Sequence, residues 1–329
     1  MLEKCKKRFL GFDIGGTKCA VTLAEREDNA LHILGKKQFP TDHSVSAYEM
    51  IDRMYAQAVE LGSKDEPIGI SCGGPLDAER GMILSPPNLP GWDKIEIVRY
   101  LRERYDAQSY LENDANACAV AEWLYGAGRG CRNMIFLTFG TGMGAGLILN
   151  GALYKGTNGN AGEIGHVRMA DFGPVGYGKT GSFEGFCSGG GIAQLGRALA
   201  LEKIQRGEAC TFARAGVQKE MTAKHIAGCA QAGDTDALQV FEQCGRMLGK
   251  GLSILVDILN PECIVLGSIY QRSKELLKKT MCAAMEQECL TQSLRVCRVV
   301  PAELNEEIGD YAALCVAIYA QRQEENDAV

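Results

Sequence analysis

Two glycine-rich segments hold the residue types that best suit phosphate binding. Consecutive glycines let successive backbone N–H groups point into one concavity, and such a nest binds anions. Threonine hydroxyls add donors, and an aspartate can hold Mg²⁺ through water because this ion gives up its water ligands reluctantly. The first segment supplies Asp13, Gly15, Gly16, Thr17 and Lys18, and the second supplies Gly140, Thr141, Gly142 and Gly144. Either segment alone can equally be a tight β-turn that binds nothing.

Both glycine segments lead into strand-like sequence and not into a helix. After Gly16 the chain continues Thr-Lys-Cys-Ala-Val-Thr-Leu, and after Gly146 it continues Leu-Ile-Leu-Asn-Gly. A dinucleotide-binding loop needs a helix after its glycines, and no stretch matches the Walker pattern GxxxxGK[ST]. We therefore expect each segment to be a β-hairpin whose turn binds phosphate.

The two segments also form an internal repeat. At an offset of 125 residues, FDIGGTKCAVTL (12–23) aligns with LTFGTGMGAGLI (137–148). Phe12 then meets Leu137, and Gly15 meets Gly140. A duplicated unit with one phosphate hairpin in each half and a cleft between the halves fits this pattern.

A carboxylate stands at a second place where chemistry is possible. The stretch LENDANA (111–117) predicts a strand that ends at Glu112 and a helix that begins near Asp114. The carboxylate of Asp114 would then lie at a helix N-terminus. Asn and Asp are also preferred N-cap residues, so a capping role for Asp114 stays open at this point.

Strand-like and helical segments alternate along the chain, which is typical of an α/β fold. Apolar strand-like runs occupy Phe9–Asp13, Cys19–Ala24, Ile68–Ser71, Ser109–Glu112, Asn133–Thr138, Ala145–Leu149, Cys263–Gly267 and Val296–Val300. Helical periodicity covers 48–61, 95–105, Gly191–Gln205, Asp236–Leu259, Ser273–Leu290 and Ile308–Gln321.

Composition and charge exclude several classes of protein. At 329 residues, with 46% hydrophobic and 23% charged, the chain is long enough for two globular domains. A net charge of −6 argues against a nucleic-acid surface. There is neither an apolar run long enough to span a bilayer nor an apolar signal core at the start of the sequence. The fourteen cysteines are scattered without a CxxC pair, which favours a cytoplasmic protein with free thiols.

Five motifs together, in order, resemble the ROK family (repressor, open reading frame, kinase) of the actin and hexokinase superfamily. They are DIGGTK (13–18), ENDANACAVAE (112–122), FGTGMGAG (139–146), NAGEIGH (160–166) and ExxxSGGG (184–191). The resemblance implies two duplicated ribonuclease-H-like α/β domains of the actin/hexokinase type with an interdomain cleft. We expect one domain to comprise 1–119 plus 307–329 and the other to comprise 120–306.

The resemblance implies an ATP-dependent hexose kinase, most simply one that converts glucose to glucose 6-phosphate, with ATP and Mg²⁺ as cofactors. Asp114 falls where the family has its catalytic base. The two glycine segments would bind the phosphates, and Gly267 would lie near the adenosine, although Ser268 follows it where relatives often have a second glycine. The residues at hexose-binding positions are Asn88, Asn113, Asp114, Glu163, His166 and Glu184.

The structural zinc of many ROK proteins is not expected here. In those relatives the histidine of GxxGH and three nearby cysteines bind the metal. Counted back from Glu184, the three cysteine positions are Val175, Tyr177 and Ser182 in this sequence. A histidine without thiolate neighbours is not a zinc site, so we predict that no zinc is bound and that His166 is free to contact the sugar.

Two alternatives to a glucose kinase stay open. One is a kinase for another hexose or for an N-acetylhexosamine such as N-acetylmannosamine. The other is a sugar-sensing protein without activity, although sugar binding alone would need neither glycine hairpin. The first strand-like run begins near Phe9, so we expect no DNA-binding domain of the kind found in the family's repressors. A homodimer is expected from the resemblance only.

Overall fold

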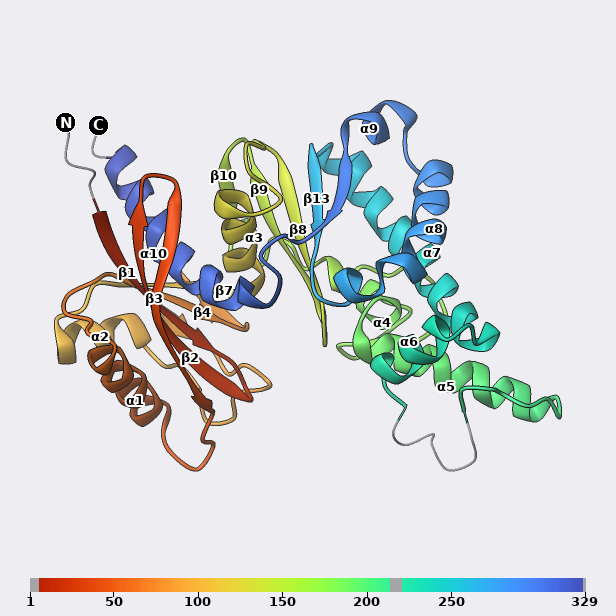
Figure 1. Ribbon diagram of the computed structural model, residues 1–329, viewed down its shortest axis with the longest axis horizontal. Helices are drawn as coiled ribbons and strands as arrows, with labels where there is room; N and C mark the ends of the chain where they lie inside the picture. The colour runs from red at the N-terminus through yellow and green to blue at the C-terminus, as the bar shows by residue number, and fades with distance from the viewer. Residues whose placement is uncertain (1–5, 214–220, 328–329) are drawn as a thin grey trace.

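A computed structural model describes residues 6–213 and 221–327 of the chain. Two five-stranded mixed sheets, with strand orders β3-β2-β1-β4-β7 and β10-β9-β8-β13-β14, dominate the fold. Each sheet belongs to its own half of the molecule, and helices α3 (Asp114–Tyr125) and α10 (Ile308–Asp327) lie between the halves (Figure 1). Within the described part of the chain, none of the helices is long and apolar enough to cross a membrane.

The first sheet is built around the first glycine segment. Its strands are β1 (Lys6–Ile14), β2 (Lys18–Glu27), β3 (Ala30–Pro40), β4 (Ile68–Cys72) and β7 (Ser109–Asn113). The first three strands are antiparallel neighbours, and β4 and β7 continue the sheet in parallel with β1. Residues 15–17 form the tight turn between β1 and β2, because the N–H of Gly15 donates to the carbonyl of Lys18 at 3.1 Å.

The second sheet repeats this arrangement strand for strand. Its strands are β8 (Met134–Phe139), β9 (Met143–Leu149), β10 (Ala152–Tyr154), β13 (Cys263–Leu266) and β14 (Arg298–Pro301). Again three antiparallel neighbours are followed by two parallel strands. Strands β1 and β8 are equivalent, as the offset of 125 residues predicted, and both glycine segments are hairpins. The duplicated α/β fold is therefore confirmed.

Helices α3 and α10 each pack on the sheet of the opposite half. Helix α3 follows a strand of the first sheet but packs on β8 and β9 of the second, and α10 follows β14 but packs on β1 and β4. Glycines permit both approaches: a Cβ at Gly146 would lie 2.6 Å from the carbonyl oxygen of Ala115, and one at Gly69 would lie 2.7 Å from the backbone nitrogen of Ala317. The predicted domain boundary at residue 119 falls inside α3 and stays a prediction.

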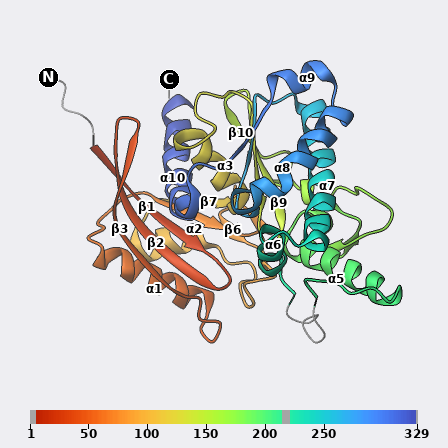
Figure 2. The same ribbon diagram turned by 45° about the vertical axis from the view of Figure 1, so that its right-hand side comes forward.

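The remaining helices lie on the sides of the two sheets away from α3 and α10, with α5 and α6 packed on α7 (Figures 1 and 2). In the first half these are α1 (Ala47–Glu60) and α2 (Ile97–Tyr105). In the second half they are α4 (Phe183–Phe186), α5 (Gly189–Gln205), α6 (Ala223–Gln231), α7 (Thr235–Leu259), α8 (Ile269–Glu288) and α9 (Thr291–Val296). Short elements complete the chain: β5 (Leu76–Asp77), β6 (Met82–Ile83), β11 (Val175–Gly176), β12 (Lys179–Thr180) and the single turns η1 (Ile164–His166) and η3 (Asn305–Glu307).

Some sequence-based boundaries were wrong. The strand expected from Val296 begins at Arg298, because the residues up to Val296 form α9. The helix expected over 273–290 runs from Ile269 to Glu288. Strand β3 was not predicted, because most of its side chains are exposed on an edge of the sheet and give no continuous apolar run.

Candidate functional site

A cavity of about 770 Å³ opens between the two halves of the molecule. Its walls come from the ends of β4 and β7 on one side and from the second glycine hairpin on the other. Ten residues singled out from the sequence line it: Asn88, Asn113, Asp114, Gly140, Thr141, Gly142, Gly144, Glu163, His166 and Glu184. The predicted cleft and most of the predicted site therefore coincide.

Asp114 faces this cavity as the first residue of α3. Its neighbour Asn113 is the N-cap, since the Asn113 side-chain oxygen accepts a hydrogen bond from the N–H of Ala115 at 3.0 Å. Asp114 is therefore not the N-cap residue, although its own Oδ1 accepts a second hydrogen bond from the same N–H of Ala115, at 2.8 Å. Burial raises the pKa of Asp114, and the charge of Glu163 raises it further. Such a carboxylate holds a proton more readily than a surface aspartate does.

Short loops and turns of the second half carry three more polar residues of the cavity wall. Glu163 and His166 flank and end the single turn η1, whose Ile164 is buried beneath the site. Glu184 lies in α4, which is capped by the Ser182 hydroxyl. One oxygen of Glu184 also accepts a hydrogen bond from the N–H of Met143 at 2.9 Å. This bond fixes Glu184 to the second hairpin, so the proposed sugar and phosphate regions share a residue.

The first hairpin does not line the cavity but lies beside it. A Cβ at Gly16 would lie 2.8 Å from the Cβ of Asn88, which does line the cavity. The turn is braced from outside by Thr41, whose hydroxyl donates to the carbonyl of Gly15 at 2.6 Å, and by His43, whose ring nitrogen lies 2.8 Å from the carbonyl oxygen of Gly16. The side chains of Thr17 and Lys18 are exposed.

Asp13 and Thr138 occupy equivalent positions in the two hairpin units. The Thr138 hydroxyl accepts a hydrogen bond from the N–H of Gly144 at 2.9 Å and so closes the second hairpin on itself. The carboxylate of Asp13 has no hydrogen bond within the described parts of the chain. Burial, Asp310 and Asp114 together raise the pKa of Asp13 to about 6. An unpartnered carboxylate in these surroundings is suited to receive a cation.

Gly267 directly follows β13 and lies next to the second hairpin. Its N–H donates to the carbonyl of Leu137 at 3.0 Å, and its carbonyl accepts from the N–H of Tyr270. The following residue, Ser268, has a φ of 48° and lies close to Gly140, since a Cβ at Gly140 would be 3.8 Å from the Ser268 hydroxyl. The segment expected near the adenosine is thus adjacent to the second glycine hairpin, where phosphate binding is expected.

An ion pair joins the halves at the rim of the site. The ammonium of Lys155, just after β10, lies 2.6 Å from the carboxylate of Glu112 in β7. Glu112 is buried, and its other oxygen accepts from the N–H of Asn113 at 3.0 Å and from the side-chain amide of Asn116 at 3.0 Å. The loop that carries Glu163 is therefore tied to the strand that carries Asn113.

The residues between His166 and Glu184 are ordered by hydrogen bonds. Strands β11 and β12 form a small hairpin, and Val175 exchanges two backbone hydrogen bonds of 2.9 Å with the side chain of Gln194. The described residues contain no group of three His, Cys, Asp or Glu side chains that could hold a metal ion. The absence of bound zinc stays a prediction, which metal analysis of the purified protein would test.

The cavity wall also contains residues that the sequence reasoning missed. Gly73, Gly74 and Pro75 directly follow β4 and lie beside Asn113 and Asp114. Their position at the carboxyl end of a parallel strand is a general sign of a ligand site and could have identified them. Asn160 lies in the motif NAGEIGH, and Tyr177 stands at one of the positions where zinc-binding relatives have a cysteine.

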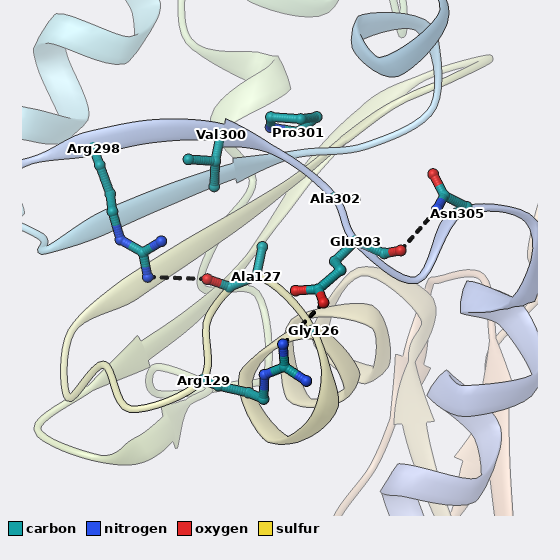
Figure 3. A pocket seen from close by; sticks show the side chains of 9 residues that line it. All are labelled: Gly126, Ala127, Arg129, Arg298, Val300, Pro301, Ala302, Glu303 and Asn305. Carbon is teal, nitrogen blue, oxygen red and sulfur yellow. Dashed lines mark hydrogen bonds and ion pairs between the residues drawn. The ribbon is translucent and has the colours of Figure 1, made fainter.

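A second hollow, of about 530 Å³, lies where the chain crosses between the halves (Figure 3). Its polar side chains already have partners: Arg129 forms an ion pair of 2.9 Å with Glu303, and Arg298 donates a hydrogen bond of 3.0 Å to the carbonyl of Ala127 (Figure 3). No residue expected at the active site lines it. The cavity around Asp114 is therefore the candidate site.

Two duplicated sheets that enclose a polar cavity, with a hairpin turn from each half beside it, define a two-domain protein of the actin/hexokinase fold class. The chain belongs to the ROK family, whose model matches residues 9–319. It is similar to the glucokinase of Halalkalibacterium halodurans, with 33% identity over 82% of this chain and 83% of the relative.

Solved structures of the same family superpose on the whole fold. A ROK hexokinase from Thermus thermophilus shares 28% identity with a TM-score of 0.79, covering 96% of this chain and 99% of its own. A ROK family glucokinase from Streptomyces griseus, in complex with glucose and AMPPNP, shares 28% identity with a TM-score of 0.74, covering 95% and 99%.

Other relatives have different activities. The bifunctional enzyme NanE/NanK of Brucella melitensis is 31% identical over 78% of this chain and 44% of its own length. The xylose repressor of Bacillus subtilis is 26% identical over 73% of this chain and 57% of its own. Family membership by itself therefore leaves the substrate open.

Proposed function

We propose that this protein is an ATP-dependent hexose kinase and that glucose is its substrate, phosphorylated on the 6-hydroxyl. The observation that carries the proposal is that Asp114, which is not the N-cap residue of α3, faces one cavity together with Glu163, His166, Glu184 and a phosphate-type hairpin. The similarity to glucokinases over most of the chain supports the same assignment.

In the proposed reaction Asp114 accepts the proton of the sugar hydroxyl. The hydroxyl oxygen forms a bond to the γ-phosphorus of ATP, and the bond from that phosphorus to the β,γ-bridging oxygen breaks, which releases ADP. Phosphoryl transfer depends mainly on positioning and on charge stabilisation, so the base acts late. The raised pKa of Asp114 suits a group that takes up a proton during the reaction.

The glycine hairpins fit the role of phosphate binding. A Cβ at Gly16 would collide with Asn88, and a Cβ at Gly142 would collide with Glu184. Glycine therefore fits both positions best, and the backbone of both turns is not covered by a side chain there. Asp13, unpartnered and with a raised pKa, is the residue that would hold Mg²⁺, directly or through water. When bound, the ion would neutralise phosphate charge.

Sugar recognition would fall to Asn88, Asn113, Glu163, His166 and Glu184. Amide, imidazole and carboxylate groups together offer both donors and acceptors, as the hydroxyls of a hexose require. An epimer that leaves one of these groups unpaired would be rejected. The ion pair between Lys155 and Glu112 would hold the sugar-binding residues of the first half in a fixed position relative to those of the second half.

An ADP-release assay across a panel of sugars tests the proposal. The panel contains glucose, mannose, fructose, allose, N-acetylglucosamine and N-acetylmannosamine, each with ATP and Mg²⁺. We expect glucose to give the highest kcat/KM. A preference for an N-acetylhexosamine would replace the proposed substrate, and sugar binding without ADP release would favour a sugar sensor.

We also propose that the protein is a homodimer. This proposal depends on the resemblance to the family alone. Light scattering coupled to gel filtration measures it: a mass near twice 35.5 kDa is expected, and a mass of one chain would contradict it.

A further inference from the structure

Tyr177 stands at the tip of the hairpin that follows His166. The pairs Val175–Thr180 and Gly176–Lys179 leave Tyr177 and Gly178 as the two residues of the turn. Their φ angles are 44° and 73°, so both residues are in the left-handed region. Two-residue turns of this kind strongly prefer Asn, Asp or Gly at the first position.

A tyrosine in this position is conformationally strained, and packing does not account for it. A bulky residue with positive φ is an outlier that usually persists for a functional reason. Tyr177 is 75% exposed, and its hydroxyl has no hydrogen bond within the described residues. Its side chain therefore does not stabilise the fold in return for the strained backbone.

The ring of Tyr177 is instead directed at the candidate sugar site. It lines the same cavity as Glu163 and Glu184, and it meets the His166 ring edge to face, with centroids 6.4 Å apart and planes at 76°. Among the described residues that line this cavity, only Tyr177 and His166 carry aromatic rings.

The hairpin that presents Tyr177 is held firmly to the site. The ammonium of Lys179 donates to the carbonyl of His166 at 2.7 Å. A Cβ at Gly176 would lie 2.8 Å from the Cβ of Glu184, so the hairpin backbone packs directly on the helix that carries this ligand. The backbone that carries Tyr177 is thus held close to both His166 and Glu184.

We propose that Tyr177 is a substrate-binding residue whose ring packs on a C–H face of the pyranose next to His166. This inference rests on the proposed function, because it takes a hexose as the occupant of the cavity. A pyranose has apolar C–H faces between its hydroxyls, and an aromatic ring can bury such a face while its own hydroxyl stays in water. The other polar residues of the wall would bind the hydroxyls.

The exposed apolar residues of the same loop offer a competing explanation. Phe172 is 86% exposed and Val175 is 45% exposed, so the loop could bind another protein. Neither residue lines the cavity, whereas Tyr177 does. Sugar contact is therefore the role that its placement favours.

Steady-state kinetics of Tyr177→Asn and Tyr177→Phe, with Phe172→Ala as the matched control, test the inference. Asn suits the turn, so Tyr177→Asn should raise the Tm by a few degrees while it raises the hexose KM about tenfold. Its kcat and its KM for ATP should stay within about twofold. Tyr177→Phe and Phe172→Ala should keep a hexose KM close to that of the unmodified protein.

Two results would overturn the inference. One is a hexose KM within twofold of the original in Tyr177→Asn; the other is an equal increase in Phe172→Ala. If the unmodified protein phosphorylates no sugar, the proposed function is wrong. The Kd for glucose, measured by calorimetric titration, then tests the inference instead: it should be about tenfold higher for Tyr177→Asn than for the unmodified protein. Absence of any sugar binding would overturn both.

Discussion

At the scale of single residues, the site depends on which of two neighbouring polar residues caps a helix. Asn113 and Asp114 both have side chains that favour the N-cap, and the sequence alone could not assign the role. In the structure Asn113 takes it and Asp114 is left facing the cavity. The position of the carboxylate was predictable from LENDANA, but the identity of the N-cap residue was not, because it depends on the backbone angles of one residue.

Asp13 provides a prediction about stability. Burial raises its pKa to about 6, whereas an aspartate in the unfolded chain titrates near about 4. The folded state therefore binds the proton more tightly, and ionised Asp13 destabilises the fold above pH ~6. Asp13→Asn should raise the free energy of unfolding by on the order of 1–3 kcal/mol at pH 8. This gain should disappear as the pH falls from about 6 to below about 4.

Urea unfolding in EDTA across this pH range measures the effect. Asp42 is the control, because hydrogen bonds from Ser44 and from Arg53 lower its pKa to about 2. Asp42→Asn should therefore have the opposite sign and lower stability at pH 8. An Asp13→Asn variant that is less stable at pH 8 would show that the carboxylate is satisfied in the fold.

At the scale of secondary structure, strands with mostly buried side chains were predictable and strands with many exposed side chains were not. Strands β4 and β13 are entirely buried, and their continuous apolar runs identify them in the sequence. Strands β3 and β14 are edge strands with exposed residues, and one was missed while the start of the other was misplaced. Edge strands carry less of the apolar pattern from which strands are recognised.

The contact of α3 with β9 gives a second prediction. A Cβ at Gly146 would collide with Ala119 and lie 2.6 Å from the Ala115 carbonyl oxygen, and backbone cannot easily yield. Gly146→Val should lower the free energy of unfolding by about 2–3 kcal/mol. It should also lower kcat, because α3 carries Asp114 at its first position.

Gly228→Ala in α6 is the matched control for this substitution. A Cβ there meets nothing within 4 Å, so alanine should stabilise the helix by about 0.5–1 kcal/mol. Thermal unfolding and the sugar kinase assay compare both variants. Equal stability of Gly146→Val and the unmodified protein would mean that α3 does not pack on β9 as described.

At the scale of the whole molecule, the duplication was visible in the sequence but the exchange of helices was not. The aligned glycine hairpins indicated two similar halves. That α3 and α10 each pack on the sheet of the other half follows from contacts between residues far apart in the chain, such as Gly69 with Ala313 and Ala317. A pattern within a single segment cannot identify such partners.

Glu122 joins the two segments that cross between the halves. It is fully buried, and its carboxylate accepts from the N–H of Ala127 at 2.7 Å, of Glu303 at 3.0 Å and of Leu304 at 2.9 Å. Ala127 follows α3, and the other two residues precede α10. The carboxylate therefore lies where a movement of the halves would pivot.

Glu122→Gln should destabilise the protein and disturb turnover. A Gln amide group cannot accept all three hydrogen bonds, and bonds to a buried charge are worth about 1.5–3 kcal/mol each, so a loss of about 2 kcal/mol or more is expected. Because hinge residues affect closure, kcat and KM should change together.

Glu303→Gln is the control at the same junction (Figure 3). Its carboxylate pairs with Arg129 at 2.9 Å, and both side chains are more than half exposed, so the substitution should change stability by less than ~0.5 kcal/mol. Thermal unfolding of both variants measures how much stability each substitution removes. Similar melting temperatures for Glu122→Gln and Glu303→Gln would exclude a joining role for the buried carboxylate.

The central claim is that Asp114 removes the proton from a sugar hydroxyl held in the cavity between the halves. The most direct test is the ratio of kcat values of the unmodified enzyme and Asp114→Asn for the preferred sugar, with sugar affinity measured by calorimetry in parallel. We predict a kcat lower by about 10²–10⁴-fold with a sugar Kd changed by less than about tenfold. A kcat within threefold of the unmodified enzyme, in a variant that folds and binds sugar, would contradict the account.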